Sequence, residues 1–600
     1  MRRSLWFFRT AGLCILAAVA PCRAQTKREA KPGTATTHYE ITGVVINSID
    51  GSAVPHCHLM PSLNEDERVG FGGGFGNEGG RGFRGRQFPA PELNSTSDFD
   101  CDAHGHFTVT LPSAGSWRLT ASARGFVSQA YDAHPPYSSA IVLTAEEPTK
   151  NLEFRISPEA SITGLVLDEA GEPVRNAQIT LQSVPPRTPG GPQPVGSTRG
   201  NARTDDRGMY ELADLSQGAY RLNVHAQPWY AANAQPFRGN DGDAAALDPS
   251  LDMAYPTTWF PGVSDAALAE TIVLHAGDTR QADFHLVPIP SIHLRITVPP
   301  PVNNGDNNNG PVRAFPIIQQ INQGGGGPGF VQTTTRFEGQ GQIDVGGLTP
   351  GVYQVRLAGY QEGHTALVEV GANSTRTLDM SAPPLDMARI ALHFDGLADS
   401  GTRQERGMQV TLINRDGQGG SFSSNGNEGG IQNVARRERD SGTDHMMEVP
   451  PGQYEVVLQG RPNLFLTGLT AKGAQAAGRY VTVGAGDSTL TIHIASGRAS
   501  LSGVATLDKK PCVGAMVLLV PVTIEEPHSI TFLRQDQTNT DGSFGLTNII
   551  PGQYILVAID HGWQINWGDP STLRRYLMQG VPIELKSSAI VKQNIVAEAP

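Results

Sequence analysis

One short pattern recurs five times along this 600-residue chain: a glycine, then any residue, then a large aromatic side chain. Alternating apolar residues follow each copy, which is typical of a half-buried β-strand. The copies are Gly115-Ser116-Trp117, Gly218-Ala219-Tyr220, Gly351-Val352-Tyr353, Gly452-Gln453-Tyr454 and Gly552-Gln553-Tyr554. Their spacing of about 100 residues fits a small β-sandwich and exceeds the roughly 20–50 residues of a solenoid repeat.

Two further signals recur around this pattern. Strands with a central glycine open three of the repeats, and such a glycine indicates a bulge or the close approach of another backbone. These strands are Ile41–Val45, Ile162–Val166 and Leu501–Ala505. Hairpin turns that contain Asp and Gly, Asp102–Gly105, Asp205–Gly208 and Asp541–Gly542, precede the pattern in the same repeats. In the last three copies a proline precedes the glycine, which predicts a type II turn with glycine at its second corner.

Composition and length agree with an all-β, multidomain chain. The 69 Gly and 43 Pro residues, with only 17% charged residues, indicate many turns. Six hundred residues exceed what one hydrophobic core organises. A net charge of −12 leaves no basic face, so nucleic acid is excluded as a partner.

The N-terminus has the features of a secretory signal peptide. Arg2 and Arg3 precede the apolar stretch 11–20, and Ala24 offers a small residue for cleavage. We therefore expect a secreted or periplasmic protein, with association with the outer membrane left open. After cleavage no segment reaches the roughly 20 apolar residues of a membrane-spanning helix.

Export permits disulfides. Cys57 and Cys101 lie in the same repeat, and a disulfide between them is one interpretation. Two small buried thiols on facing strands are the alternative. Cys512 stands alone in the last repeat.

These signals divide the chain into a leader and five sandwiches. The predicted ranges are signal peptide 1–24 and sandwiches 38–157, 158–290, 291–384, 385–496 and 497–600. The first sandwich carries a Gly-rich loop at 70–92, and the second an aromatic-rich insertion at 227–270. A single helix is predicted over Pro570–Met578, with Asp569 as its N-cap.

These residues resemble the carboxypeptidase regulatory-like domain. The segments that carry the resemblance are Ile162–Val166 through Ala177, Thr204–Tyr210 and Gln217–Leu222; the fifth repeat matches nearly as well. The resemblance implies a tandem array of about five seven-stranded, transthyretin-like (Ig-like) β-sandwiches with a carbohydrate-binding-like fold. Such domains accompany metallocarboxypeptidases and also occur in exported bacterial proteins. The shared motifs specify a fold rather than an activity.

No catalytic, cofactor or metal site is predicted. The pair His445 and Glu448 runs directly into a Pro-Pro turn, and no His-Glu-x-x-His zinc motif occurs. The histidines at 56, 58, 104 and 106 suggest zinc, but solvent-facing histidines beside a disulfide explain them as well. The carboxylates at 98, 100 and 102 lack the acidic twelfth residue of a calcium loop, so turn formation accounts for them.

Aromatic side chains are the candidates for ligand binding, because an exposed aromatic face can stack on a sugar ring. The candidates are Trp229, Tyr230, Tyr255, Trp259, Phe260, Trp563 and Trp567. The alternative is that they pack onto the sandwiches as satellite core, as large aromatics usually do.

The chain is therefore predicted to be a non-enzymatic binding protein of the cell envelope. A glycan is the favoured partner, by the family resemblance, and an envelope protein is another. A structural or adhesion spacer that contacts protein partners is the alternative function. A third is an accessory module to a separately encoded peptidase.

Overall fold

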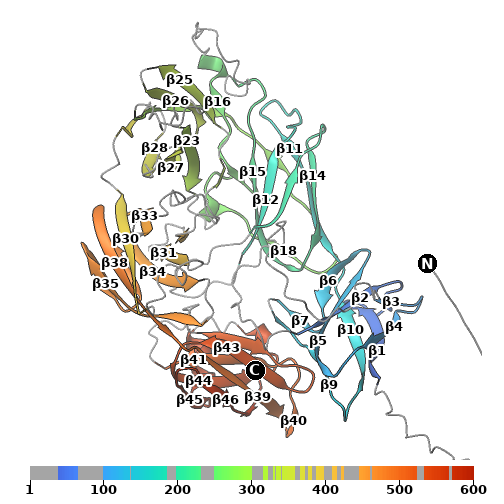
Figure 1. Cartoon of the computed structure of the whole chain (residues 1–600). Coiled ribbons are helices and arrows are strands. Elements are labelled where there is room, and N and C mark those ends of the chain that lie inside the picture. Colours follow the sequence, from blue (N-terminus) through green and yellow to red (C-terminus); the bar gives the residue numbers. More distant parts are fainter. Residues whose placement is uncertain are drawn as a thin grey trace, which may run out of the picture.

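β-Strands make up almost all of the regular secondary structure of the computed structural model (Figure 1). It describes residues 38–64, 99–135, 137–184, 198–231, 249–299, 315–321, 329–330, 333–339, 341–358, 365–371, 376–381, 387–396, 409–414, 421–423, 445–459, 463–522, 533–565 and 570–600. The signal peptide and the Gly-rich loop 70–92 lie outside these residues. The described strands form ten larger sheets, which pair into five β-sandwiches, and two two-stranded sheets. We call the sandwiches units 1 to 5 in chain order.

Unit 1 shows the strand order. One sheet has the order β10 (Thr149–Ile156), β1 (Tyr39–Asn47), β4 (His106–Leu111). The other has the order β3 (Phe99–Asp100), β2 (His58–Leu63), β5 (Gly115–Ala123), β6 (Phe126–Ala130), with β9 (Ile141–Leu143) also on β5. A small hairpin, β7 (Ala133–His134) and β8 (Tyr137–Ser138), extends from this unit.

Unit 2 repeats this arrangement. Its first sheet has the order β14 (Met209–Leu215), β11 (Ala160–Leu167), β19 (Thr279–Gln281), with β20 (Phe284–His285) also on β11. The second has the order β13 (Thr198–Arg203), β12 (Gln178–Ser183), β15 (Gly218–His225), β17 (Thr258–Trp259), with β18 (Ile272–Leu274) also on β15. The antiparallel pair β16 (Met253–Ala254) and β21 (Ile289–Pro290) lies where the chain passes to unit 3.

Units 3 and 4 follow the same order. One sheet of unit 3 has the order β25 (Thr334–Gly339), β26 (Gln342–Leu348), β22 (Ile292–Thr297), β29 (Arg376–Asp379). Its other sheet has the order β24 (Gly329–Phe330), β23 (Phe315–Ile321), β27 (Gly351–Ala358), β28 (Thr365–Val370). One sheet of unit 4 has the order β33 (His445–Val449), β30 (Ala388–Asp395), β38 (Gly486–Ser496), β35 (Leu464–Lys472). Its other sheet has the order β32 (Ser421–Ser423), β31 (Gln409–Asn414), β34 (Gly452–Gln459), β37 (Tyr480–Val483), β36 (Ala474–Ala477).

Unit 5 ends the described chain. One sheet has the order β40 (Lys510–Pro511), β39 (Ala499–Leu507), β43 (Ser543–Ile549), with β46 (Ile590–Lys592) and β47 (Ile595–Val596) also on β39. The other has the order β42 (Arg534–Gln537), β41 (Met516–Pro521), β44 (Gly552–Ile559), β45 (Val581–Leu585). In each unit the first long strand pairs in parallel with a late strand, as β1 does with β10 and β39 with β46.

Helices are few. The predicted helix is present as α2 (Pro570–Leu577), although its expected cap, Asp569, lies outside the described residues. Short 3-10 turns occur at η3 (Pro249–Leu251), η4 (Ala266–Leu268) and η5 (Gly562–Gln564). The described part of the chain contains no helix with the length and hydrophobicity that crossing a membrane requires.

The recurring aromatic residue forms the same buried corner in every unit. Trp117, Tyr220, Tyr353, Tyr454 and Tyr554 are each at most 6% exposed. Each donates a hydrogen bond to the backbone carbonyl four residues earlier: Tyr220 to Ser216, Tyr353 to Thr349, Tyr454 to Pro450, Tyr554 to Ile550, and the Trp117 indole to Ser113. A large ring can therefore fill the core without leaving its polar atom unpaired.

The type II turn predicted at the glycine of this pattern is wrong. Neither Gly351 nor Gly552 has the positive φ that the second corner of such a turn requires. Both residues begin strands instead. In unit 5 a Cβ on Gly552 would lie 3.5 Å from the ring of Tyr554, which is an ordinary contact distance.

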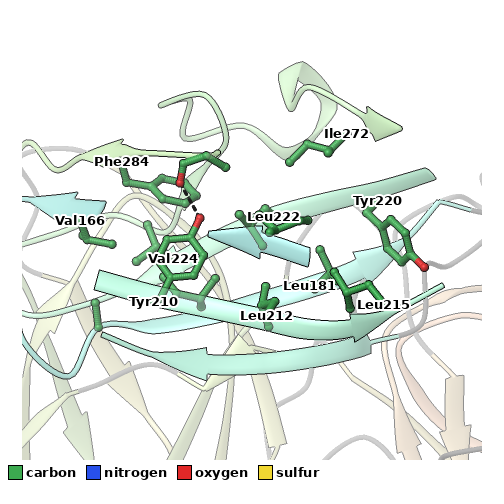
Figure 2. Close-up of a cluster of buried hydrophobic side chains, with 14 of the residues drawn as sticks. Val166, Leu181, Tyr210, Leu212, Leu215, Tyr220, Leu222, Val224, Ile272 and Phe284 are labelled. Atoms are coloured by element: carbon green, nitrogen blue, oxygen red, sulfur yellow. Dashed lines mark hydrogen bonds between the residues drawn. The ribbon is translucent and has the colours of Figure 1, made fainter. Parts of the chain in front are cut away.

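The glycine inside the first strand marks a close backbone approach, as predicted. A Cβ on Gly164 would lie 2.0 Å from the carbonyl oxygen of Ala282, which accepts the hydroxyl of Tyr210 (Figure 2). Equivalent Cβ atoms on Gly43 and Gly503 would lie 2.1 and 1.9 Å from backbone oxygens. The late strand therefore passes the first strand at a distance that only glycine permits.

Each unit has its own hydrophobic core between its two sheets. In unit 2, Ile162 of β11 packs in the same cluster as Ile179 of β12 and Leu222 of β15. Figure 2 shows the ring of Tyr210 beside Phe284 at one end of this core and Tyr220 at the other. In unit 1, Cys57 and Cys101 are buried and form a disulfide, whereas Cys512 of unit 5 is a buried free thiol. The separate cores agree with the tandem-sandwich fold; the exact domain boundaries stay a prediction.

The first and last units contact each other, so the five units follow a closed path (Figure 1). The Gln537 side-chain amide donates to the backbone oxygen of Asp132 at 2.7 Å and to Ser139 Oγ at 2.9 Å. Ser139 Oγ in turn donates to the Thr538 carbonyl at 2.8 Å. The rings of His134 and Trp563 stack with centroids 3.6 Å apart. Ser139, Gln537 and Thr538 are at most 1% exposed, so water does not compete for these bonds.

A double variant tests this closure. Replacing Gln537→Ala and Trp563→Ala removes the buried hydrogen bonds and the stacked ring, which should weaken docking by about 1–3 kcal/mol. Small-angle scattering of the full chain should then give a larger radius of gyration. Gln553→Ala, at an exposed position of the same unit, is the control. An unchanged radius for the double variant would contradict a closed path held by these residues.

A second contact joins the insertion of unit 2 to unit 3. His293 lies between two carboxylates, with Nδ1 2.7 Å from Asp344 and Nε2 2.8 Å from Asp252. The hydrogen bond to Asp344 raises the pKa of His293 to about 9, with Asp252 adding to the effect. The imidazolium is therefore the form that the folded contact favours.

This contact predicts a pH dependence of stability. Because the pKa of His293 is raised above its ordinary value of about 6.5, its contribution is complete below that pH and is lost as pH rises through about 9. His293→Gln should lower the free energy of unfolding by about 1–3 kcal/mol at pH 6 and by less at pH 9.5. Thermal unfolding followed by circular dichroism measures the difference. His104→Gln, at an exposed histidine, is the control, and a His293→Gln effect equal at both pH values would refute the charged pairing.

Candidate ligand-binding site

The predicted aromatic residues of the insertion fall into an exposed and a buried group. Trp229 is 78% exposed, and the next residue, Tyr230, is partly exposed. Tyr255 and Trp259 are only 7% and 2% exposed, and Phe260 packs against the core of unit 2. The satellite-core alternative therefore describes Tyr255, Trp259 and Phe260, while Trp229 and Tyr230 have surface available to a ligand.

The remaining tryptophans do not join the exposed pair. Trp259 packs with Ala266 and Ala269 in a small cluster of its own. Trp563 contacts His134 across the contact between units 1 and 5, where its ring supports domain packing. Trp567 lies outside the described residues.

A tight turn between β11 and β12 brings an unpredicted residue, Glu169, to the exposed aromatics. The Asp168 carboxylate accepts hydrogen bonds from the backbone N–H groups of Ala170 and Glu172, at 2.9 and 2.8 Å. Gly171 supplies the positive φ of +80° that closes the turn. Glu169 therefore stands exposed at the tip, on a backbone held by its neighbour.

Two tyrosines converge on Glu169. The hydroxyl of Tyr230 donates to Oε1, and that of Tyr255 donates to Oε2 at 2.7 Å. Trp229 meets Tyr230 edge to face, with ring centroids 5.8 Å apart. The site is thus a carboxylate flanked by aromatic rings, with one broad indole surface exposed to solvent.

The protonation states follow from these contacts. Partial burial acts to raise the pKa of Glu169, but the two tyrosine hydroxyls outweigh it and hold the pKa below its usual range. Burial and the same carboxylate raise the pKa of Tyr230 to about 12 and also raise that of Tyr255. At neutral pH the site therefore contains an ionised carboxylate and two neutral phenols.

The residues considered for zinc or calcium serve turns and strands. The Asp102 carboxylate accepts the backbone N–H groups of His104 and His106, each at 2.8 Å. His58 Nδ1 lies 3.1 Å from Asp100 on the neighbouring strand. Within the described ranges, no group of three or more His, Cys, Asp or Glu side chains is placed to hold a metal ion.

The possible peptidase pair lies on a strand. His445 and Glu448 both belong to β33 (His445–Val449).

A comparison with protein-family models finds a match within unit 2. Residues 161–252 match the family model of the carboxypeptidase regulatory-like domain. This part of unit 2 is similar to the carboxypeptidase regulatory-like domain. Glu169, Trp229 and Tyr230 lie within the matched range, whereas Tyr255 follows it. The matched range therefore includes the carboxylate and both exposed rings of the site.

Comparisons with other proteins add little. A search of curated proteins finds no match. Among solved structures, the Bacillus anthracis TIE protein is similar at 12% identity and a TM-score of 0.14, over 82% of this chain and 62% of that one. The minor pilin of Streptococcus agalactiae is similar at 11% identity and a TM-score of 0.19, over 42% and 97%. The major pilin subunit of Bacillus cereus is similar at 8% identity and a TM-score of 0.13, over 73% and 99%. Likeness at this level carries no functional argument.

A titration tests the geometry of the site. Glu169→Gln should lower the pKa of Tyr230 from about 12, because the carboxylate no longer disfavours the phenolate. The part of the shift caused by burial remains. Ultraviolet difference absorbance of tyrosinate measures the change, with Glu172→Gln, on the same turn, as the control. Identical titrations of wild type and Glu169→Gln would show that the hydrogen bond to Tyr230 is absent in solution.

Proposed function

We propose that this chain is an exported, non-catalytic binding protein that presents a carbohydrate-binding surface on its regulatory-like domain. The observation that carries the proposal is Trp229, a large apolar ring that is 78% exposed beside a carboxylate. Its face is available to a ligand, and the ring of Tyr230 lies next to it at a centroid distance of 5.8 Å. A sugar ring presents apolar C–H groups to an aromatic face and hydroxyls to a polar neighbour.

Two features support export. The N-terminal segment has the pattern of a signal peptide, and the disulfide between Cys57 and Cys101 is of a kind that persists in oxidising compartments. The proposed location is the periplasm or the cell exterior. Association with the outer membrane would follow from the ligand rather than from a membrane-spanning helix.

The alternative is a structural or adhesion spacer. An extended spacer gains reach from each added domain, but the hydrogen bonds between Gln537 and unit 1 bring the ends of the array together. A closed array holds one surface in a defined position, which suits a binding protein better than a rod. No feature of the described residues favours a peptidase accessory over these two functions.

A glycan array tests the proposal. Wild-type protein should bind at least one glycan class, and Trp229→Ala should weaken that binding by about tenfold or more, about 1.4 kcal/mol. Met209→Ala, which removes another exposed apolar side chain of unit 2, should leave binding unchanged. An array without binding, or equal binding by wild type and Trp229→Ala, would refute a carbohydrate site at this tryptophan.

A further inference from the structure

We infer that the site formed by Trp229, Tyr230, Tyr255 and Glu169 selects sugars that donate hydrogen bonds and carry positive charge. It should prefer a hexosamine with a free amine to the neutral hexose and should exclude the uronic acid. This inference rests on the proposed function and adds the ligand class. Glu169, which the aromatic pattern of the sequence does not reveal, becomes the residue that determines specificity.

The first argument is that the carboxylate and the two phenols of the site offer acceptors to a ligand. An ionised carboxylate only accepts hydrogen bonds and has about four lone-pair positions. Tyr230 and Tyr255 each occupy one of them with their single hydroxyl proton. The remaining carboxylate positions and the phenol oxygens can only accept. A ligand must therefore supply donors, which hydroxyl and ammonium groups do and a carboxylate does not.

The second argument is charge. Among the described residues, the ionisable groups that act on the pKa values of these three side chains are Asp168 and His285, besides the three themselves. Asp168 adds a second negative charge beneath the turn. The faces of Trp229 and Tyr230 also attract cations. Both effects favour an ammonium group and oppose an anionic sugar.

The third argument is that the fold does not need this arrangement. The β11–β12 turn depends on the Asp168 carboxylate and on Gly171. The exposed Glu169 side chain instead accepts hydrogen bonds from two tyrosines of the insertion, its side-chain partners among the described residues. In the corresponding turn of unit 1, Asn47 takes the place of Asp168, and Ser48 follows it where unit 2 has Glu169. The shared turn therefore forms in unit 1 without a carboxylate at that position.

The experiment compares four β-1,4-linked hexamers by isothermal titration calorimetry on the full chain. They are cellohexaose, hexaglucosamine, hexa-N-acetylglucosamine and hexaglucuronate. Hexaglucosamine should bind about two- to fivefold tighter than cellohexaose, as expected for a solvent-exposed ion pair, and the preference should shrink at high salt. The N-acetylated hexamer should lose this gain, and hexaglucuronate should bind most weakly.

Two variants assign the preference to its residue. Glu169→Gln should abolish the advantage of hexaglucosamine and should bring hexaglucuronate close to cellohexaose, because the amide is uncharged and can donate. Glu172→Gln removes an equal charge from the same turn without touching the tyrosines, and it should keep the wild-type order. Circular dichroism confirms that both variants are folded.

The outcomes separate the two proposals. Binding of the hexamers without the predicted order, or an equal change with Glu172→Gln, overturns the specificity and leaves a carbohydrate site in place. Failure of every hexamer, together with an array that shows no glycan binding, overturns the proposed function and this inference with it.

Discussion

The structure depends on one hydrogen bond that is repeated in every unit, from a buried aromatic side chain to the carbonyl four residues before it. A ring of this size supplies much of the apolar area that a small sandwich buries, but a tyrosine or tryptophan also brings a polar atom. Left unpaired, that atom would cost about 1–3 kcal/mol. The bond from Tyr353 to Thr349, or from Tyr554 to Ile550, removes this cost and ties the turn to the strand that follows.

A second packing feature, a glycine in the first strand, recurs in three of the units. Gly43, Gly164 and Gly503 allow a late strand to approach the first strand so closely that a methyl group would overlap its carbonyl oxygens. In units 1, 2 and 5 this contact lies at the parallel edge of the sandwich. With the cores sealed in this way, the segments between strands are free to differ from one unit to the next. The site of unit 2 is made from such segments: a β-turn and a long insertion.

Much of this could be predicted from the sequence, for physical reasons that particular residues make plain. The role of Asp102 and Asp205 in hairpin turns depends on neighbours two to four residues away, so local sequence shows it. The sequence revealed only part of the candidate site. Trp229 and Tyr230 stand out by residue type, but Glu169 looks like any polar turn residue, and its partner Tyr255 is 86 residues away. The prediction of a type II turn was wrong because proline and glycine together fit several local conformations. In the structure Gly351 and Gly552 begin strands instead.

By itself, the sequence determined the all-β class, the repeated sandwich and the position of each aromatic corner, because periodicity and turn chemistry act over a few residues. Only the tertiary structure decided which aromatics are exposed, since Trp229 and Trp259 have the same side chain and differ only in what packs around them. It also decided that unit 1 meets unit 5. That contact joins residues about 400 positions apart, such as Ser139 and Thr538, and no local pattern encodes a partner at that distance.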